Sequence, residues 1–309
     1  MNRRRFTQAL ATAALAAAVP ELPAAPRTGA PASEAGQSPQ TTGGPFSISI
    51  MLWTVFNKLP FEERLEKMAE AGFSNVELVG EYAKWSADDF ARANAARKRL
   101  GIHFDATAGL RQRLVDPAAR EAFLAEFSAA LKPMETLGCP AMIVLSGNAT
   151  PDIPRQTQHD AMVETLKRAA GVIEGKQIEG QPVKILLECI DPEENPKIYL
   201  TSAAEGMEIV RKVNHPQVRF LYDMFHEQIG HGNLIEKLEK NIDTVDLIHI
   251  ADVPGRHEPG TGEINYNNIY RKLGQLNYKG MVAMEFYPTG DPVTMLREAK
   301  RNAWAAAAG

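Results

Sequence analysis

Four residues that can bind a divalent metal each stand at the end of a short apolar run in the second half of the chain. The runs VKILLE, VRFLYD, VDLIH and MVAME end at Glu188, Asp223, His249 and Glu285. Strands buried on both faces have near-continuous apolar sequences, and in a parallel barrel their C-terminal ends share one mouth. Three carboxylates and one imidazole would meet there, a set that suits Mg²⁺, Mn²⁺ or Zn²⁺ and leaves positions open for a substrate.

The elements that must position these residues alternate between strand-like and helix-like patterns, which is typical of βα units. In one of the intervening segments, Phe61, Leu65 and Met68 recur at the spacing of a single helix face. Glycines that follow such segments, as in AEAGF and METLGCP, are typical of helix ends. We therefore expect an α/β fold, a single-domain (β/α)₈ TIM barrel. The expected strands are Ser47–Trp53, Asn75–Val79, His103–Thr107, Ala141–Leu145, Val183–Ile190, Val218–Met224, Leu247–Asp252 and Met281–Phe286.

The N-terminal residues have the pattern of an export signal. Arg3, Arg4 and Arg5 precede Phe6 and an uncharged stretch rich in Ala and Leu. This stretch is shorter than the roughly 20 residues of a membrane span, so residues 1–25 are predicted to be a twin-arginine-type signal peptide. Residues 26–45 are rich in Pro, Ala, Gly, Ser and Thr, which predicts a disordered linker before a barrel over residues 46–309. We expect the mature protein to be periplasmic.

The overall charge restricts the partners that this chain can have. The formal net charge is −4 and the isoelectric point is about 6.0, so the chain has no strongly basic surface for nucleic acid. After Pro20 no segment has the length and hydropathy of a membrane span, so we expect no membrane partner once the signal is cleaved. The expected partner is a small hydroxy-acid or sugar substrate, and the sequence is compatible with a homo-oligomer.

Several segments resemble the hydroxypyruvate isomerase family, within the xylose-isomerase-like TIM barrel superfamily that also includes ketose 3-epimerases. They are LPFEERLEKMAEAGFSNVEL, LGCPAMIVLSGN, LYDMFHEQI and HIADVPGRHEPGTGEINY. The resemblance extends from about Ile50 to Pro288. It implies that the four strand-end residues are the metal ligands, and that two of them, Glu188 and Glu285, also act as the acid/base pair.

Neighbouring residues are candidates for holding the substrate. By resemblance to the epimerases, His226 would donate a hydrogen bond to a substrate oxygen near the metal. Arg256 is the candidate clamp for a substrate carboxylate, because guanidinium binds carboxylate in a bidentate manner. His257 shares a Gly/Pro-rich loop with Arg256 that we expect to cover the site, and Glu77 would form the pocket floor or contact a ligand. For the two histidines, the competing interpretation is a purely structural hydrogen bond, and for Arg256 it is a solvent-facing side chain.

The expected activity is a metal-dependent isomerisation of an α-hydroxy aldehyde and ketone. In the hydroxypyruvate/tartronate-semialdehyde type of reaction, or in the equivalent sugar reaction, a proton moves between adjacent carbons through an enediolate. One alternative is a sugar epimerase similar to the ketose 3-epimerases, which His249 favours because hydroxypyruvate isomerases commonly have Gln at that position. A second alternative is a non-catalytic periplasmic sugar-binding protein, and fold alone does not exclude it. A DNA-repair nuclease of the same superfamily is disfavoured by the acidic charge balance and the seven histidines.

Overall fold

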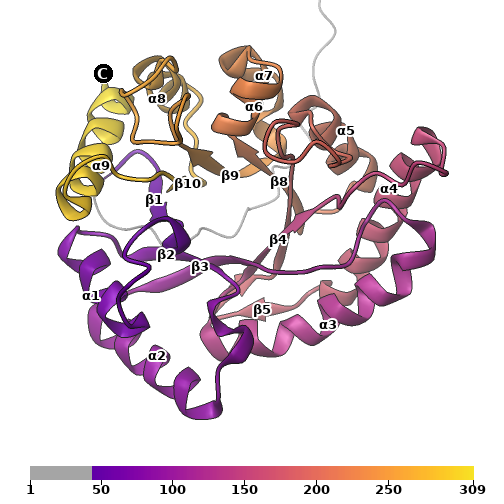
Figure 1. Cartoon of the computed structure of the whole chain (residues 1–309), viewed down its shortest axis with the longest axis horizontal. Coiled ribbons are helices and arrows are strands. Elements are labelled where there is room, and N and C mark those ends of the chain that lie inside the picture. The colour runs from indigo at the N-terminus through magenta and orange to yellow at the C-terminus, as the bar shows by residue number, and fades with distance from the viewer. Residues whose placement is uncertain (1–43) are drawn as a thin grey trace, which may run out of the picture. The chain divides into compact units, whose positions relative to one another are not determined.

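The computed structural model describes residues 44–309, in which eight parallel strands form a barrel with helices packed around it (Figure 1). The predicted signal peptide and nearly all of the predicted linker lie in residues 1–43, outside the described part. The barrel strands are β1 (Ser47–Ile50), β2 (Asn75–Val79), β3 (His103–Ala108), β4 (Ala141–Leu145), β7 (Lys184–Glu188), β8 (Val218–Asp223), β9 (Val245–Ile250) and β10 (Met281–Met284).

The strand order shows how the barrel closes. The sheet runs β1-β10-β9-β8-β7-β4-β3-β2, and every neighbouring pair is parallel. A parallel bridge between Met51, just after β1, and Glu77 in β2 joins the two outer strands. Interior side chains such as Leu186, Leu221 and Leu247 form a buried cluster inside this ring. The predicted TIM barrel is therefore confirmed.

Helices connect successive strands on the outside of the barrel. The α-helices are α1 (Phe61–Glu70), α2 (Ala87–Leu100), α3 (Arg120–Leu137), α4 (Arg155–Ile173), α5 (Ala203–Val213), α6 (Met224–Gly230), α7 (Leu234–Asn241), α8 (Tyr266–Gln275) and α9 (Pro292–Ala308). Short 3₁₀ turns are η1 (Leu52–Thr54), η2 (Glu81–Lys84), η3 (Pro117–Ala119) and η4 (Ile242–Thr244). No helix of residues 44–309 has both the length and the apolar character needed to cross a bilayer.

Local sequence signals explain where several helices begin and end. Ser86 and Asp89 form a reciprocal capping box at the start of α2. Gly101 and Gly138 end α2 and α3 in the left-handed conformation (φ 65° and 67°), as the glycines in the sequence predict. In α1 the face predicted from the apolar spacing is buried at Leu65 and Met68.

The four strands that carry the predicted ligands each end one or two residues earlier than the sequence expectation. The seventh barrel strand was expected over residues 247–252, but β9 begins at Val245 and ends at Ile250. Beyond it, Asp252 pairs with His257 as an isolated antiparallel bridge, which turns the chain into the following loop. The last strand ends at Met284, so Glu285 lies just past the ladder, with its amide still bonded to the carbonyl of Ile250.

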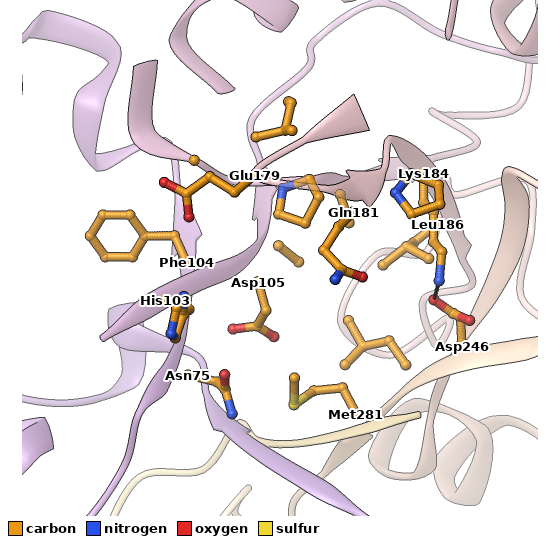
Figure 2. Close-up of a pocket in the computed structure, with 17 residues that line it drawn as sticks. Asn75, His103, Phe104, Asp105, Glu179, Gln181, Lys184, Leu186, Asp246 and Met281 are labelled. Atoms are coloured by element: carbon orange, nitrogen blue, oxygen red, sulfur yellow. Dashed lines mark hydrogen bonds and ion pairs between the residues drawn. The ribbon is translucent and has the colours of Figure 1, made fainter. Parts of the chain in front are cut away.

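The N-terminal end of the barrel carries a short hairpin that the sequence did not predict. Strands β5 (Gln177–Ile178) and β6 (Gln181–Pro182) pair antiparallel around Glu179 and Gly180, both at positive φ (48° and 79°), as in a type I′ turn. The hairpin borders a cavity at this end of the barrel, which we call the floor cavity (Figure 2).

Candidate active site

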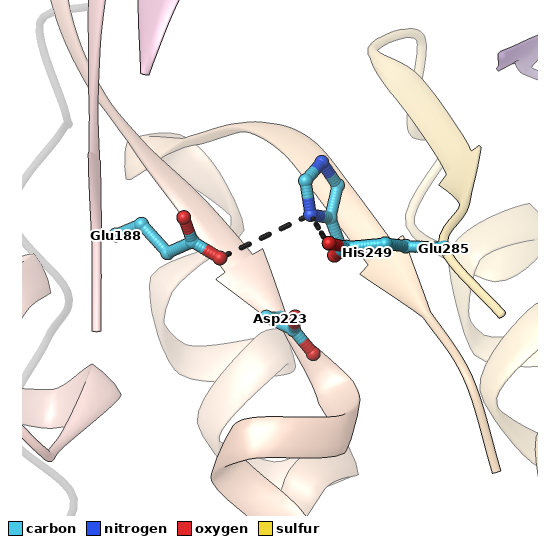
Figure 3. A group of neighbouring side chains, drawn as sticks. All are labelled: Glu188, Asp223, His249 and Glu285. Atoms are coloured by element: carbon cyan, nitrogen blue, oxygen red, sulfur yellow. Dashed lines mark ion pairs between the residues drawn. The ribbon is translucent and has the colours of Figure 1, made fainter. Parts of the chain in front are cut away.

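The structure brings the four predicted metal ligands together at the C-terminal mouth of the barrel. Glu188 and Asp223 are the last residues of β7 and β8, His249 lies near the end of β9, and Glu285 follows β10. All four are buried, and one potential ligand atom from each lies within 4.8 Å of the others (Figure 3). Residues separated by almost a hundred positions therefore form one compact group, because parallel strands present their ends on the same side.

Three polar atoms at the centre of this group have no hydrogen-bond partner among the described residues. They are Asp223 Oδ2, His249 Nδ1 and Glu285 Oε2. Buried polar atoms are normally paired, since leaving one unpaired costs about 1–3 kcal/mol. The Nδ1 and Oε2 atoms are 2.8 Å apart without hydrogen-bond geometry. Two carboxylate oxygens and one ring nitrogen directed at a common point fit a divalent cation, and Glu188 would supply a fourth ligand atom.

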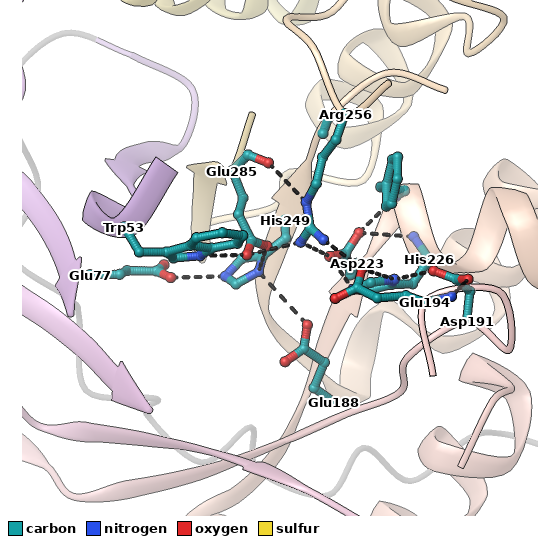
Figure 4. Close-up of polar contacts among 12 residues, drawn as sticks. Trp53, Glu77, Glu188, Asp191, Glu194, Asp223, His226, His249, Arg256 and Glu285 are labelled. Atoms are coloured by element: carbon teal, nitrogen blue, oxygen red, sulfur yellow. Dashed lines mark hydrogen bonds and ion pairs between the residues drawn. The ribbon is translucent and has the colours of Figure 1, made fainter. Parts of the chain in front are cut away.

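Glu77 fixes the orientation of the His249 ring. The Nε2 atom of His249 lies 2.8 Å from Glu77 Oε2, and Glu77 is completely buried inside the barrel (Figure 4). A carboxylate that accepts the N–H of one ring nitrogen leaves the other nitrogen free to bind metal. Glu77 therefore directs Nδ1 toward the centre, which is the second of the two roles that the sequence left open for it.

The charges in the mouth strongly shift the pKa values of its members. Burial is the main cause that raises the pKa of Glu188 to about 8, with the Glu285 and Asp223 carboxylates adding to it against His249. Burial would also raise the pKa of Glu285, but His249 and Arg256 outweigh it and hold that pKa well below its usual range. The pKa of His249 lies well above the ordinary value because Glu77 and Glu285 overcome the effect of burial. The protein thus concentrates negative charge where a cation would bind.

The two carboxylate oxygens of Asp223 have different roles, one in capping a helix and one in facing the central group. Its Oδ1 accepts hydrogen bonds from the backbone amides of Phe225 (2.7 Å) and His226 (3.2 Å), which caps the start of α6. Its Oδ2 is the unpaired oxygen that faces the centre. One side chain therefore both starts the helix and presents a potential ligand atom in a fixed direction.

Arg256 lies over the same group, but other carboxylates already occupy its guanidinium. It is 2.9 Å from Glu285 Oε1 and 2.9 Å from Glu194 Oε2, and it stacks against Phe225 and Trp53 at 4.9 and 5.6 Å. Burial and stacking fix the orientation of the Arg256 guanidinium, because a planar guanidinium packs well on aromatic faces. A substrate carboxylate at Arg256 would therefore have to share or displace a bond to Glu194.

His226 also reaches the mouth. Its Nε2 lies 3.5 Å from Asp223 Oδ2, and its Nδ1 lies 2.6 Å from Asp191 Oδ2. Burial would lower the pKa of His226, but the Asp223 charge and the Asp191 hydrogen bond raise it to about 9. Asp191 is itself fixed, because its Oδ1 accepts from the amides of Glu193 and Glu194, each at 2.8 Å.

Sequence reasoning missed three residues of this site, Trp53, Asp191 and Glu194. The indole N–H of Trp53 donates to Glu285 Oε1 at 2.9 Å, from a position just beyond the first strand. Asp191 and Glu194 lie in the acidic segment after β7. The position of Trp53 at the end of an expected strand could have marked it as a site residue. Asp191 and Glu194 are identified only by their contacts in the folded structure.

His257 is the predicted substrate residue that the structure does not bring to the centre. Its Nδ1 lies 2.7 Å from the backbone oxygen of Tyr287, so it joins the loop to the segment after β10. Asp252 shapes the same loop by accepting from the amides of Val253, Gly260 and Ile264. Glu258 holds the amide of Thr289 at 3.0 Å. In this loop, the hydrogen bonds of His257 and Glu258 are structural.

Comparison with known proteins assigns the family. Residues 65–307 match the family described as xylose isomerase-like TIM barrel. The chain is 30% identical to a putative hydroxypyruvate isomerase of Danio rerio, over 76% of this chain and 88% of that protein. It is also 30% identical to a 2-oxo-tetronate isomerase of Haemophilus influenzae, over 79% and 95% of the two chains. A crystal structure from Brucella melitensis titled AP endonuclease, family 2, superposes with a TM-score of 0.72 at 28% identity, over 81% of this chain and 96% of that one. The chain therefore belongs to the hydroxypyruvate isomerase family of xylose isomerase-like TIM barrels, and it is an isomerase.

Proposed function

We propose that this isomerase is metal-dependent and moves a proton between adjacent carbons of a short α-hydroxycarbonyl compound. The observation that carries the proposal is the set of three unpaired, buried polar atoms, on Asp223, His249 and Glu285, that face one another at the barrel mouth. Together with Glu188 they would hold Mg²⁺, Mn²⁺ or Zn²⁺. When bound, the cation would act as a Lewis acid that lowers the barrier to C–H ionisation.

The protein's own side chains would carry out the proton transfer. Glu188 and Glu285 come from β7 and β10, so they approach the centre from separated parts of the barrel wall. One carboxylate would remove the C–H proton, and the other, in its protonated form, would deliver a proton to the neighbouring carbon of the enediolate, while the substrate's hydroxyl proton passes to the former carbonyl oxygen. Trp53 and Arg256 both contact Glu285 Oε1, which orients this carboxylate for either step. His226, held by Asp191, is placed to donate to a substrate oxygen.

Replacement of Glu285 by Gln tests the acid/base role. We expect Glu285→Gln to reduce isomerisation and solvent deuterium incorporation by about 10³-fold or more, because the amide cannot accept the proton. Proton NMR of hydroxypyruvate and 2-oxo-tetronate in D₂O measures both. Glu174→Gln, at an exposed glutamate that follows α4, is the matched control and should exchange at the normal rate. Full exchange by Glu285→Gln would overturn the role, and tight sugar binding without exchange in the native protein would favour the non-catalytic alternative.

The bond between Arg256 and Glu194 supports a sugar epimerase as the second candidate. A substrate carboxylate at Arg256 would meet the negative charge of Glu194, whereas the hydroxyl groups of a neutral sugar could hydrogen-bond to both side chains. Glu194→Gln separates the two. If the substrate is a hydroxy acid, we expect its KM to fall several-fold in this variant. If it is a sugar, we expect kcat/KM to fall instead, and both classes are measured in the same deuterium assay.

We also propose export to the periplasm, on the basis of the arginine pair and apolar stretch before Pro20. Replacement of Arg3 and Arg4 by Lys should retain the protein in the cytoplasm of a host with twin-arginine transport. Cell fractionation with antibody detection measures this. Unchanged export of the double variant would contradict the proposed route.

A further inference from the structure

The floor cavity lies at the opposite end of the barrel from the candidate active site. It has a volume of about 160 Å³ and lies between the first residues of several barrel strands and the β5–β6 hairpin (Figure 2). The four predicted metal ligands are not among the residues that line it. It is therefore a separate space within the same barrel.

The cavity exists because the interior side chains at this end are small. Ala106 and Ala141, from β3 and β4, face the interior cluster and line the cavity. The interior layers of a TIM barrel are usually filled by bulky branched residues. Two alanines in adjacent strands leave room that Leu186, on the neighbouring strand β7, and Met281, on β10, do not fill.

Two hydrogen-bond acceptors face this mainly apolar space. Asp105 lines the cavity, and its Oδ1 accepts a hydrogen bond from Ser49 at 2.7 Å. Asn75 is only 1% exposed, and its Oδ1 has no donor among the described residues. The amide of Asn75 cannot simply be reversed, because its Nδ2 donates to the carbonyl of Ile48 at 3.1 Å. Figure 2 shows the Asn75 oxygen on the side of the Asp105 carboxylate.

The lysine and the arginine near the cavity are engaged elsewhere. Lys184 is on the wall, but its ammonium lies 2.7 Å from Asp246. At the rim, Glu179 binds Arg97 at 2.5 Å. Neither pair supplies a donor to Asp105 or Asn75, so among the described residues no lysine or arginine neutralises the Asp105 carboxyl group or bonds to the Asn75 side-chain oxygen. An occupant that satisfies both must carry several N–H or O–H donors on one small group.

We propose that the floor cavity is a second ligand site that takes a small primary ammonium ion with a compact apolar body. The three N–H donors of the ammonium group satisfy Asp105 and the unpaired oxygen of Asn75. The hydrocarbon part packs against Ala106, Ala141 and Met281. The volume suits a body of about four to six carbons, since an engineered apolar cavity of about 150 Å³ holds benzene.

A titration with n-butylammonium, observed by methyl NMR on the metal-loaded protein, tests the site. We expect saturable shifts of the Ala106, Ala141 and Met281 methyl signals. We expect 1-butanol, which has the same body without the charge, to bind at least about tenfold more weakly. Asp105→Asn keeps the acceptor for Ser49 and should weaken n-butylammonium binding by at least about tenfold. Glu179→Gln removes a rim carboxylate as the matched control and should alter the affinity by less than about twofold.

Three results would overturn the proposal. Equal affinity for n-butylammonium and 1-butanol would show an apolar cavity without ammonium recognition, and this measurement needs no variant. Unchanged n-butylammonium affinity in folded Asp105→Asn would remove the carboxylate from the site. Methyl shifts confined to the barrel mouth, or no shifts at all, would show that the floor cavity holds only water.

Discussion

The two ends of the barrel are formed by the same eight strands but differ in how tightly their side chains pack and in how many charged groups contact one another. At the mouth, Glu188, Asp223 and Glu285 lie against His249 and Arg256, so charged side chains contact one another throughout the site. At the floor, Asp105 accepts a hydrogen bond from Ser49, and alanines leave a cavity beside it. A dense set of mutually oriented charges suits catalysis on a polar substrate, whereas a loosely filled apolar space with few acceptors suits only weak and simple recognition.

The length of the connecting segments explains much of this difference. At the floor, helices return to strands through short turns, such as residues 71–74 and 138–140. At the mouth, residues 189–202 and 251–265 connect strands to helices, and they contribute Asp191, Glu194 and Arg256. Long loops on a rigid barrel can bring several functional groups to one point, so the chemistry concentrates at the end that has them.

Metal removal is the largest expected perturbation, and it acts on the mouth alone. Dialysis against a chelator should abolish turnover, because the site would lose the cation that acts as a Lewis acid on the substrate. It should also lower the melting temperature by about 5 °C or more, since a ligand present at 100 times its Kd adds about 2.7 kcal/mol to the free energy of unfolding. Activity assays and thermal melts before and after addition of Mg²⁺, Mn²⁺ or Zn²⁺ measure both effects.

Asp223→Asn provides the control for that prediction. The amide oxygen still caps α6, so the fold should persist, but the charge of one potential ligand is lost. We expect added metal to raise the melting temperature of this variant much less than that of the native protein. Equal stabilisation of both proteins would place the metal elsewhere, and no effect of the chelator would argue against a metal at the mouth.

Glu77 gives a smaller and more selective test, because it lies inside the barrel between the two ends. It accepts from His249 and also helps to raise the pKa of Asp105 through its charge, after burial, which is the larger cause. Glu77→Gln should weaken metal binding by about 10- to 100-fold without removing a ligand, as the loss of a carboxylate behind a metal-binding histidine does. Competition with a fluorescent chelator measures this affinity. An unchanged affinity would show that the His249 ring is held without Glu77.

The sequence predicted those parts of the molecule that depend on local pattern. Apolar runs identify strands, and strand ends in a parallel barrel meet on one side, so the convergence of Glu188, Asp223, His249 and Glu285 follows from periodicity and topology. Glycine helix ends such as Gly101 follow from backbone sterics. These features need no knowledge of the loops.

The parts that the sequence did not predict depend on contacts between distant segments. Glu194 reaches Arg256 across 62 positions, and Trp53 reaches Glu285 across 232. Neither has a local signature, and His257 could not be separated from Arg256 within the loop that they share. The floor cavity was also hidden, because a gap depends on the packing of small side chains from several strands rather than on any one of them.

The smallest expected effect concerns the packing of the floor, and it tests whether that end is truly underfilled. Ala141→Val adds two methyl groups at the cavity wall and suits a strand, so it should raise the free energy of unfolding by about 1 kcal/mol. Ala283→Val is the matched change at a completely buried interior alanine outside the cavity lining, and it should cost about 1–3 kcal/mol through overpacking. Urea unfolding of both variants measures the two values. If both substitutions destabilise equally, the floor is as tightly packed as the rest of the interior. If only Ala141→Val stabilises and it also weakens n-butylammonium binding, the same space accounts for both the slack packing and the ligand site.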